Sequence, residues 1–135
     1  MKIVLDSNVI IAAFASRGLC NALFESCIGN HDIILCEQIL SEIANNLKRK
    51  IRLPDDVIRQ LLILLRSHST IVTPQKVDKK ACKDKKDLMV LGSAIAGHAK
   101  YIITGDQDLL AVGRIKDVKI VDPRTFWSEM KRKAE

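Results

Sequence analysis

Short apolar runs that end in acidic residues constrain the fold of this chain more than any other feature. The first run, Ile3–Leu5, stops at Asp6, and Ser7 and Asn8 separate it from the apolar residues that resume at Val9. This pattern indicates a buried β-strand followed by a turn into a helix. Because an unpartnered buried carboxylate is costly, Asp6 is expected either to cap that helix or to serve a cation.

The same pattern returns twice along the chain. Ile33–Leu35 precedes Glu37 and Glu42, and Tyr101–Ile103 precedes Asp106. In an open parallel sheet, ligand sites lie beyond the carboxyl ends of the strands. These acids, together with Asp108, are therefore expected to converge on one edge of a sheet.

Between and after these runs, apolar residues recur at helical spacing, and two further short strands are predicted. The helical segments are 9–14, 19–27, 39–47, 57–65, 88–99 and 126–130, and the additional strands are 71–72 and 118–121. Alternating strands and helices predict an α/β fold, a three-layer α/β/α sandwich with a central, mainly parallel sheet. Without linkers or repeats, residues 1–135 are expected to form a single domain.

Composition favours a globular protein with an anionic partner. Hydrophobic residues make up 47% of the chain and the formal net charge is +6, which favours partners such as nucleic acid. Aromatic residues make up only 4%, so phosphate contacts are expected to matter more than base stacking. The four cysteines form no C-x-x-C pair and are expected to be free thiols. With no apolar stretch of roughly 20 residues and no signal peptide, a cytoplasmic protein without a membrane span is expected.

Converging carboxylates favour a hard divalent cation. Two unit charges 4 Å apart repel by about 4 kcal/mol at an effective dielectric constant near 20, so three or four unshielded acids would be hard to tolerate. Oxygen ligands without cysteine or histidine favour Mg²⁺ or Mn²⁺ over zinc. Asp84 and Asp87, at the start of the 88–99 helix, are candidates to join the site. Taken singly, each acid can instead be a helix cap or a surface residue, as is expected for Asp122 before Pro123.

The segments around the acids resemble a known family. They are Ile3–Asn8, the helical Glu42, Cys82–Asp87 and Ile102–Leu110. Together they look like the motifs of a PIN domain, in the family's order and spacing, and are similar to VapC-like toxin ribonucleases of prokaryotic toxin–antitoxin systems. The most specific segment is Thr-Gly-Asp-Gln-Asp-Leu, from Thr104 to Leu109.

The resemblance implies a Rossmann-like fold whose acids bind Mg²⁺ or Mn²⁺ and hydrolyse phosphodiester bonds in RNA. The residues carried over are Asp6, Glu42, Asp87 and Asp106 as catalytic acids, Asp6, Asp87, Asp106 and Asp108 as metal ligands, and Asn8 and Thr104 as polar supports. Related sequences often have Asp-Pro and a further acid at the positions of Asp84–Lys86. It therefore stays open whether Asp84 or Asp87 is the metal ligand. Asp87 is preferred because it is expected to open the helix. It also stays open whether Glu37 or Glu42 belongs to the site, because both lie at the margin of the helix's apolar stripe.

Partners are expected on two surfaces. Basic segments at 48–52, 79–86 and 131–133 are expected to contact RNA phosphates, above all Lys83, Lys85 and Lys86 beside the acids. For 131–133, solvated lysines are an equal explanation. The unusually apolar helix that contains Leu61–Leu65 is expected either in the core or on a surface that binds a second copy or a cognate antitoxin.

Two other functional classes compete with a ribonuclease toxin. A non-catalytic PIN-like RNA-binding or scaffold module would keep the fold, and loss of one of the acids would signal it. A phosphatase with an aspartate nucleophile would require a second acid at the position of Asn8, so Asn8 counts against it.

Overall fold

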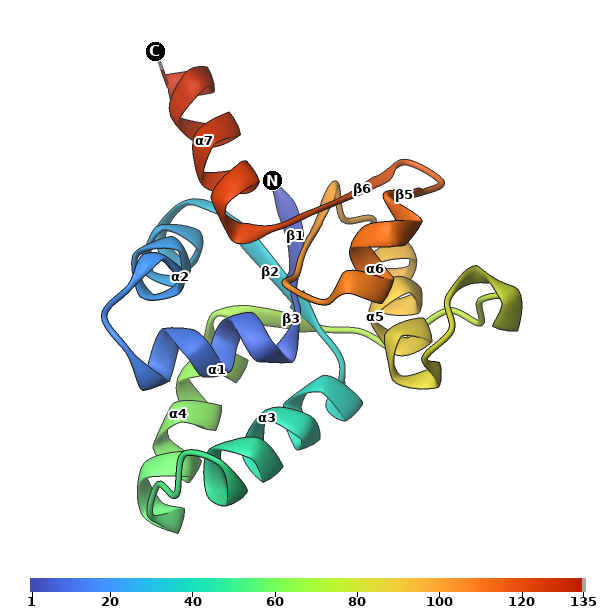
Figure 1. The fold of residues 1–135 in the computed structure, drawn as a ribbon. Coiled ribbons are helices and arrows are strands. Elements are labelled where there is room, and N and C mark those ends of the chain that lie inside the picture. The colour runs from blue at the N-terminus through green and yellow to red at the C-terminus, as the bar shows by residue number, and fades with distance from the viewer. Residues whose placement is uncertain (135) are drawn as a thin grey trace.

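The apolar runs form the strands of one sheet in the computed structural model, which describes residues 1–134 (Figure 1). The strands are β1 (Lys2–Leu5), β2 (Asp32–Leu35), β3 (Ser69–Ile71), β4 (Tyr101–Ile103), β5 (Arg114–Ile115) and β6 (Val118–Val121). Their order in the sheet is β3-β2-β1-β4-β6-β5, and only β5 runs antiparallel to its neighbour. The predicted mainly parallel sheet is confirmed, with β1 at its centre.

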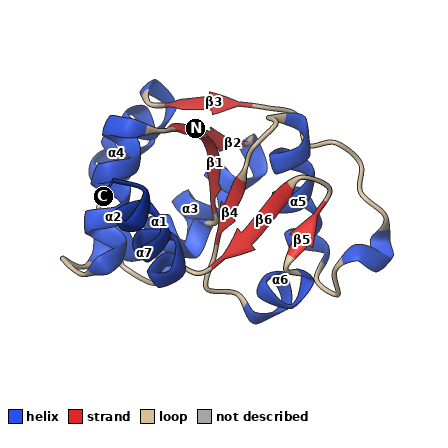
Figure 2. Ribbon diagram, turned by 90° about the horizontal axis from the view of Figure 1, so that it is seen from above, coloured by secondary structure: helices blue, strands red, loops and turns tan. Residues whose placement is uncertain are grey.

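Helices cover both faces of this sheet. They are α1 (Ser7–Ala15), α2 (Leu19–Asn30), α3 (Glu37–Arg49), α4 (Asp55–Ser67), α5 (Lys85–Ala96), α6 (Gln107–Val112) and α7 (Pro123–Ala134), with a 3₁₀ turn at Lys79–Ala81. In Figure 2, α1, α2 and α7 lie on one side of the strands and α5 lies on the other. This arrangement is the α/β/α sandwich that the alternation of elements predicts.

Aspartates begin four of the helices. Asp6, Asp84 and Asp106 are the caps of α1, α5 and α6, and Asp122 accepts a 2.7 Å hydrogen bond from the Thr125 amide in the first turn of α7. Such side chains satisfy amide groups that have no partner within the helix. The expectation that Asp87 opens its helix is wrong, because Asp84 takes that position and Asp87 lies in the first turn instead.

The core consists of aliphatic side chains from the central strands and the inner faces of the helices. Ile3, Leu5, Ile33, Leu35 and Ile102 are among the fully buried side chains. A sheet flanked by helices on both faces buries its strands on both sides, which explains why these runs are continuously apolar rather than alternating.

Helix α4 only partly joins this core. It buries Ile58 and Leu65, whereas Ile63 is 62% exposed and Leu64 is 39% exposed. The helix is therefore packed along one side and exposes apolar side chains to solvent on another.

Within residues 1–134, no single helix is long and apolar enough to cross a membrane. Helices α1 and α2 meet the length and composition criteria only as a pair bent by 109°. Both bury side chains in the core of the protein.

Candidate metal centre

Thr104 links two of the acids at the carboxyl edge of the sheet. Strands β1 and β4 are parallel neighbours with Leu5 opposite Ile103, so the residues that follow them, Asp6 and Thr104, lie side by side. The Thr104 hydroxyl donates a 2.7 Å hydrogen bond to Oδ2 of Asp6 and accepts a 3.0 Å hydrogen bond from the Asp106 amide. Thr104 is fully buried, so this hydroxyl holds the two acids in a fixed relation.

Asp6 is a buried carboxylate with both oxygens in use. Its Oδ1 accepts a 2.8 Å hydrogen bond from the Ser7 amide, while Oδ2 faces Thr104. Burial raises the pKa of Asp6, and these hydrogen bonds oppose that rise; the charges of Glu42 and Asp106 raise the pKa further. The helix-cap role that the sequence allowed is therefore real, and the same carboxylate also faces other acids.

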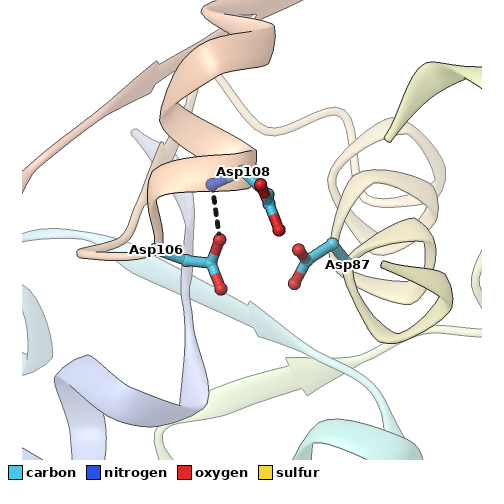
Figure 3. A group of neighbouring side chains, drawn as sticks. All are labelled: Asp87, Asp106 and Asp108. Atoms are coloured by element: carbon cyan, nitrogen blue, oxygen red, sulfur yellow. Dashed lines mark hydrogen bonds between the residues drawn. The ribbon is translucent and has the colours of Figure 1, made fainter. Parts of the chain in front are cut away.

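Asp106, Asp108 and Asp87 direct their carboxylates toward one space between α6 and α5 (Figure 3). One carboxylate oxygen from each of the three lies within 4.8 Å of the others. Oδ1 of Asp106 accepts hydrogen bonds from the amides of Asp108 at 2.8 Å and Leu109 at 3.2 Å. These bonds orient Asp106 and leave its second oxygen without an intrahelical partner.

Asp87 is a buried acid that neighbours the other carboxylates. Its side chain is buried, and Oδ2 accepts a 3.7 Å hydrogen bond from the thiol of Cys82. Burial, together with the charges of Asp106, Asp84 and Asp6, raises the pKa of Asp87 to about 6. The neighbouring carboxylates thus disfavour the ionised form of Asp87, and a bound cation would favour that form instead.

The two acids of α3 have different surroundings. Glu37 forms a two-pronged ion pair with Arg66 of α4, with both nitrogen–oxygen distances at 2.8 Å, and Arg66 lowers the pKa of Glu37. Glu42 lies one turn further along, half-buried, and its charge acts on Asp6. The structure therefore turns Glu42 toward the acids and gives Glu37 a cationic partner of its own.

A cleft of about 850 Å³ opens beside these acids. Among the residues predicted from the sequence, its lining includes Asp6, Asn8, Glu42, Asp87, Asp106, Lys85, Lys86 and also Glu37, the alternative to Glu42. Asp84 also lines it, but that carboxylate is exposed and accepts a 2.9 Å hydrogen bond from the Lys86 amide as the cap of α5. Lys83 and Asp108 are exposed and do not line the cleft, although Asp108 lies within reach of Asp87 and Asp106.

Sequence reasoning missed two contributors to this region. The first is Cys82, expected only to be a free thiol, whose thiol donates a hydrogen bond to Asp87. The second is the polar face of α3, from which Gln38 and Asn45 line the cleft together with Arg49, the last of which belongs to the predicted basic segment 48–52. The spacing of these three residues with Glu42 in the sequence is the signal that could have identified that face.

Comparisons with known proteins agree with this geometry. A family model described as PIN domain matches residues 2–108. No match to this chain was found among curated proteins.

Several solved structures share the fold. VapBC2 from Rickettsia felis, bound to a DNA fragment from its promoter, has 17% identity and a TM-score of 0.60 over 90% of this chain and 98% of that chain. VapBC-1 from nontypeable Haemophilus influenzae has 15% identity and a TM-score of 0.62 over 92% and 99%. FitAcB from Neisseria gonorrhoeae has 16% identity and a TM-score of 0.57 over 90% and 98%. At these identities, the likeness establishes the fold and leaves the chemistry to the residues of the site.

Proposed function

The chain belongs to the PIN domain family, and we propose that it is a metal-dependent endoribonuclease, the toxin component of a toxin–antitoxin system. The main support is the convergence of Asp6, Asp87 and Asp106, which come from three separate elements, beside one open cleft. VapC-type PIN toxins are ribonucleases as a class, and the acids on which such chemistry depends are all present here.

The donor set fits Mg²⁺ or Mn²⁺. Asp87, Asp106 and Asp108 offer carboxylate oxygens close to one another. Asp6 is connected to Asp106 through the hydrogen bonds of the Thr104 hydroxyl. Hard divalent cations prefer oxygen ligands of this kind. When bound, such an ion supplies a Lewis acid and lowers the pKa of a coordinated water.

The acids of the chain would have two further roles, in holding the ion and in orienting the attacking water. Asp106 and Asp6 are held by hydrogen bonds before any ligand arrives, so their orientation costs little on binding. Asp87 and Glu42 would orient a water for in-line attack on phosphorus. The water oxygen forms the new bond to phosphorus, the bond to the 3′ oxygen breaks, and that oxygen takes a proton, which leaves a 5′-phosphate.

The partners we propose are an RNA substrate, a cognate antitoxin and a second copy of the chain, acting in the cytoplasm. The solved relatives include toxin–antitoxin complexes, which supports an antitoxin partner. The exposed apolar side chains of α4, Ile63 and Leu64, supply a surface for protein contact.

The test is RNA cleavage in Mn²⁺ by purified wild type and Asp6→Asn. Asparagine retains the cap of α1, so the variant should fold, and cleavage should fall by at least about a hundredfold. Asp32→Asn, at an exposed position at the start of β2, is the matched control and should cleave like wild type. Undiminished cleavage by Asp6→Asn would refute the assignment. Wild type that binds RNA without cleaving it would instead favour the non-catalytic RNA-binding module.

A further inference from the structure

One face of α3 forms a wall of the cleft that contains the acids. The residues on this face that line the cleft are Gln38, Glu42, Asn45 and Arg49. Intervals of four, three and four residues place side chains on one side of a helix. The residues that α3 buries in the core are Ile39, Leu40, Ile43 and Leu47. The polar face is therefore available for a ligand, because other residues of the helix provide its packing.

The chemistry of this face changes along the helix. Glu42 lies near Asp6, and Arg49 lies two turns further on, about 10 Å away at a rise of 1.5 Å per residue. Lys50 follows Arg49 at the end of α3 and also lines the cleft, whereas Lys85 and Lys86 line it from the start of α5, next to Asp87. The cleft thus joins an acidic end, suited to a cation, to a basic end, suited to phosphate.

The amide side chains of α3 that line the cleft have no hydrogen-bond partner within residues 1–134. Among the side-chain hydrogen bonds of residues 1–134, none involves the amide groups of Gln38, Asn45 or Asn46. The ion pairs of that part of the chain likewise leave Arg49 unpaired. An amide side chain offers two donors and an acceptor, which matches the hydrogen-bonding edge of a nucleobase.

We propose that α3 is the substrate-binding helix, along which a single-stranded RNA lies. The phosphodiester to be cleaved lies at the acids, a neighbouring phosphate contacts Arg49, and Asn45 and Asn46 hydrogen-bond to the bases between them. This inference rests on the proposed nuclease function, and it identifies the residues that set the cleavage sequence.

The lining of the cleft favours single-stranded RNA whose bases are recognised by hydrogen bonds. No aromatic side chain lines the cleft, so bases have no platform on which to stack. The edges of paired bases in an RNA duplex lie in grooves that side chains read poorly, whereas unpaired bases expose their edges to amide groups. Three cationic side chains of the cleft, Lys50, Lys85 and Lys86, remain for backbone phosphates.

Binding tests the phosphate contact without requiring cleavage. The protein is Asp106→Asn, in which asparagine keeps the cap of α6, and the probe is a fluorescein-labelled 12-nucleotide single-stranded RNA in Mg²⁺. Adding Arg49→Ala should raise the dissociation constant about tenfold and reduce the slope of log K against log salt by about 0.7. Arg59→Ala, at an exposed position on α4 outside the cleft, is the matched control and should change neither quantity. Equal effects of Arg49→Ala and Arg59→Ala would overturn the proposal, as would tighter binding of the same sequence as a duplex.

Cleavage of a randomised RNA pool tests the base contact. Asn45→Ala should weaken the preference for one nucleotide at one position by about five- to tenfold. Gln60→Ala, an exposed amide on α4, is the control and should leave the preference unchanged. An unchanged preference in Asn45→Ala would overturn the proposal while wild-type cleavage upholds the nuclease. RNA binding that depends on Arg49 in a protein that cannot cleave would uphold the binding helix and refute the nuclease.

Discussion

Replacing Asp87 by asparagine should stabilise the metal-free protein while it weakens the response to metal. The pKa of Asp87 rises from 3.8 to about 6, and each pKa unit corresponds to about 1.4 kcal/mol. The ionised side chain thus lowers the free energy of unfolding by at most about 3 kcal/mol. Because the carboxylate faces an open cleft in which water screens charges, we expect Asp87→Asn to gain about 1–2 kcal/mol at pH 8.

The direction of the pH dependence follows from the raised pKa. Below pH 3.8, Asp87 is protonated in both the folded and unfolded states, and wild type and variant should have similar stability. Between pH 3.8 and 6, the unfolded state releases its proton first, so wild-type stability falls relative to the variant as pH rises. Above pH 6, the difference should be constant.

Thermal unfolding in EDTA measures this effect. For a chain of 135 residues, 1–2 kcal/mol corresponds to a rise in Tm of about 4–7 °C at pH 8. Mn²⁺ should then raise the Tm of wild type more than that of Asp87→Asn. Asp56→Asn, an exposed acid in the first turn of α4, is the matched control and should change Tm by no more than about 2 °C. A variant less stable than wild type in EDTA, or a difference that does not vary between pH 3.5 and 7, would refute the reasoning.

Three further substitutions test the packing around the site and the exposed helix. Thr104→Val should lower the free energy of unfolding by about 2 kcal/mol, because it removes the hydroxyl that links Asp6 and Asp106. Thr104→Ser keeps that hydroxyl and should cost less than about 1 kcal/mol. Equal losses in the two variants would contradict this role. Gly92→Ala should destabilise the protein by about 2 kcal/mol, because the new Cβ would lie 2.2 Å from the carbonyl oxygen of Gln75 in the loop after β3. Gly29→Ala is the control in the same melting assay and should be tolerated, because a Cβ there meets open space. If α4 forms a homodimer, Ile63→Lys with Leu64→Lys should halve the molar mass measured by light scattering, and a wild type already monomeric at high concentration would contradict that dimer.

Local sequence signals were sufficient for most of the fold. The apolar runs predict β1, β2, β4 and β6 nearly to their observed bounds, because strands buried on both faces are continuously apolar. The two-residue strand β5 was missed, since its only pairing is with β6 and its own residues carry no strand pattern. Helix α1 begins at Ser7 rather than at Val9 because the side chain of Asp6 caps it.

The site was harder to predict where the deciding contacts are distant in sequence. Glu37 and Glu42 lie on the same helix at the margin of its apolar stripe, and Arg66, from the next helix, distinguishes them. Asp84 and Asp87 both fit the start of α5 in sequence. Asp84 is exposed and accepts a hydrogen bond from the Lys86 amide, whereas Asp87 is buried beside Asp106 and Asp108. The preference for Asp87 thus rested on a wrong premise, although burial and the neighbouring acids now support it as a candidate ligand.

The most direct test of the central claim, that the acids at the sheet edge form a divalent-cation site, is anomalous scattering from a crystal soaked in Mn²⁺. We predict a peak in the space between Asp87 and Asp106, within coordination distance of their carboxylate oxygens, and its loss in Asp106→Asn. No peak at these acids, or a peak that persists unchanged in Asp106→Asn, would contradict the claim.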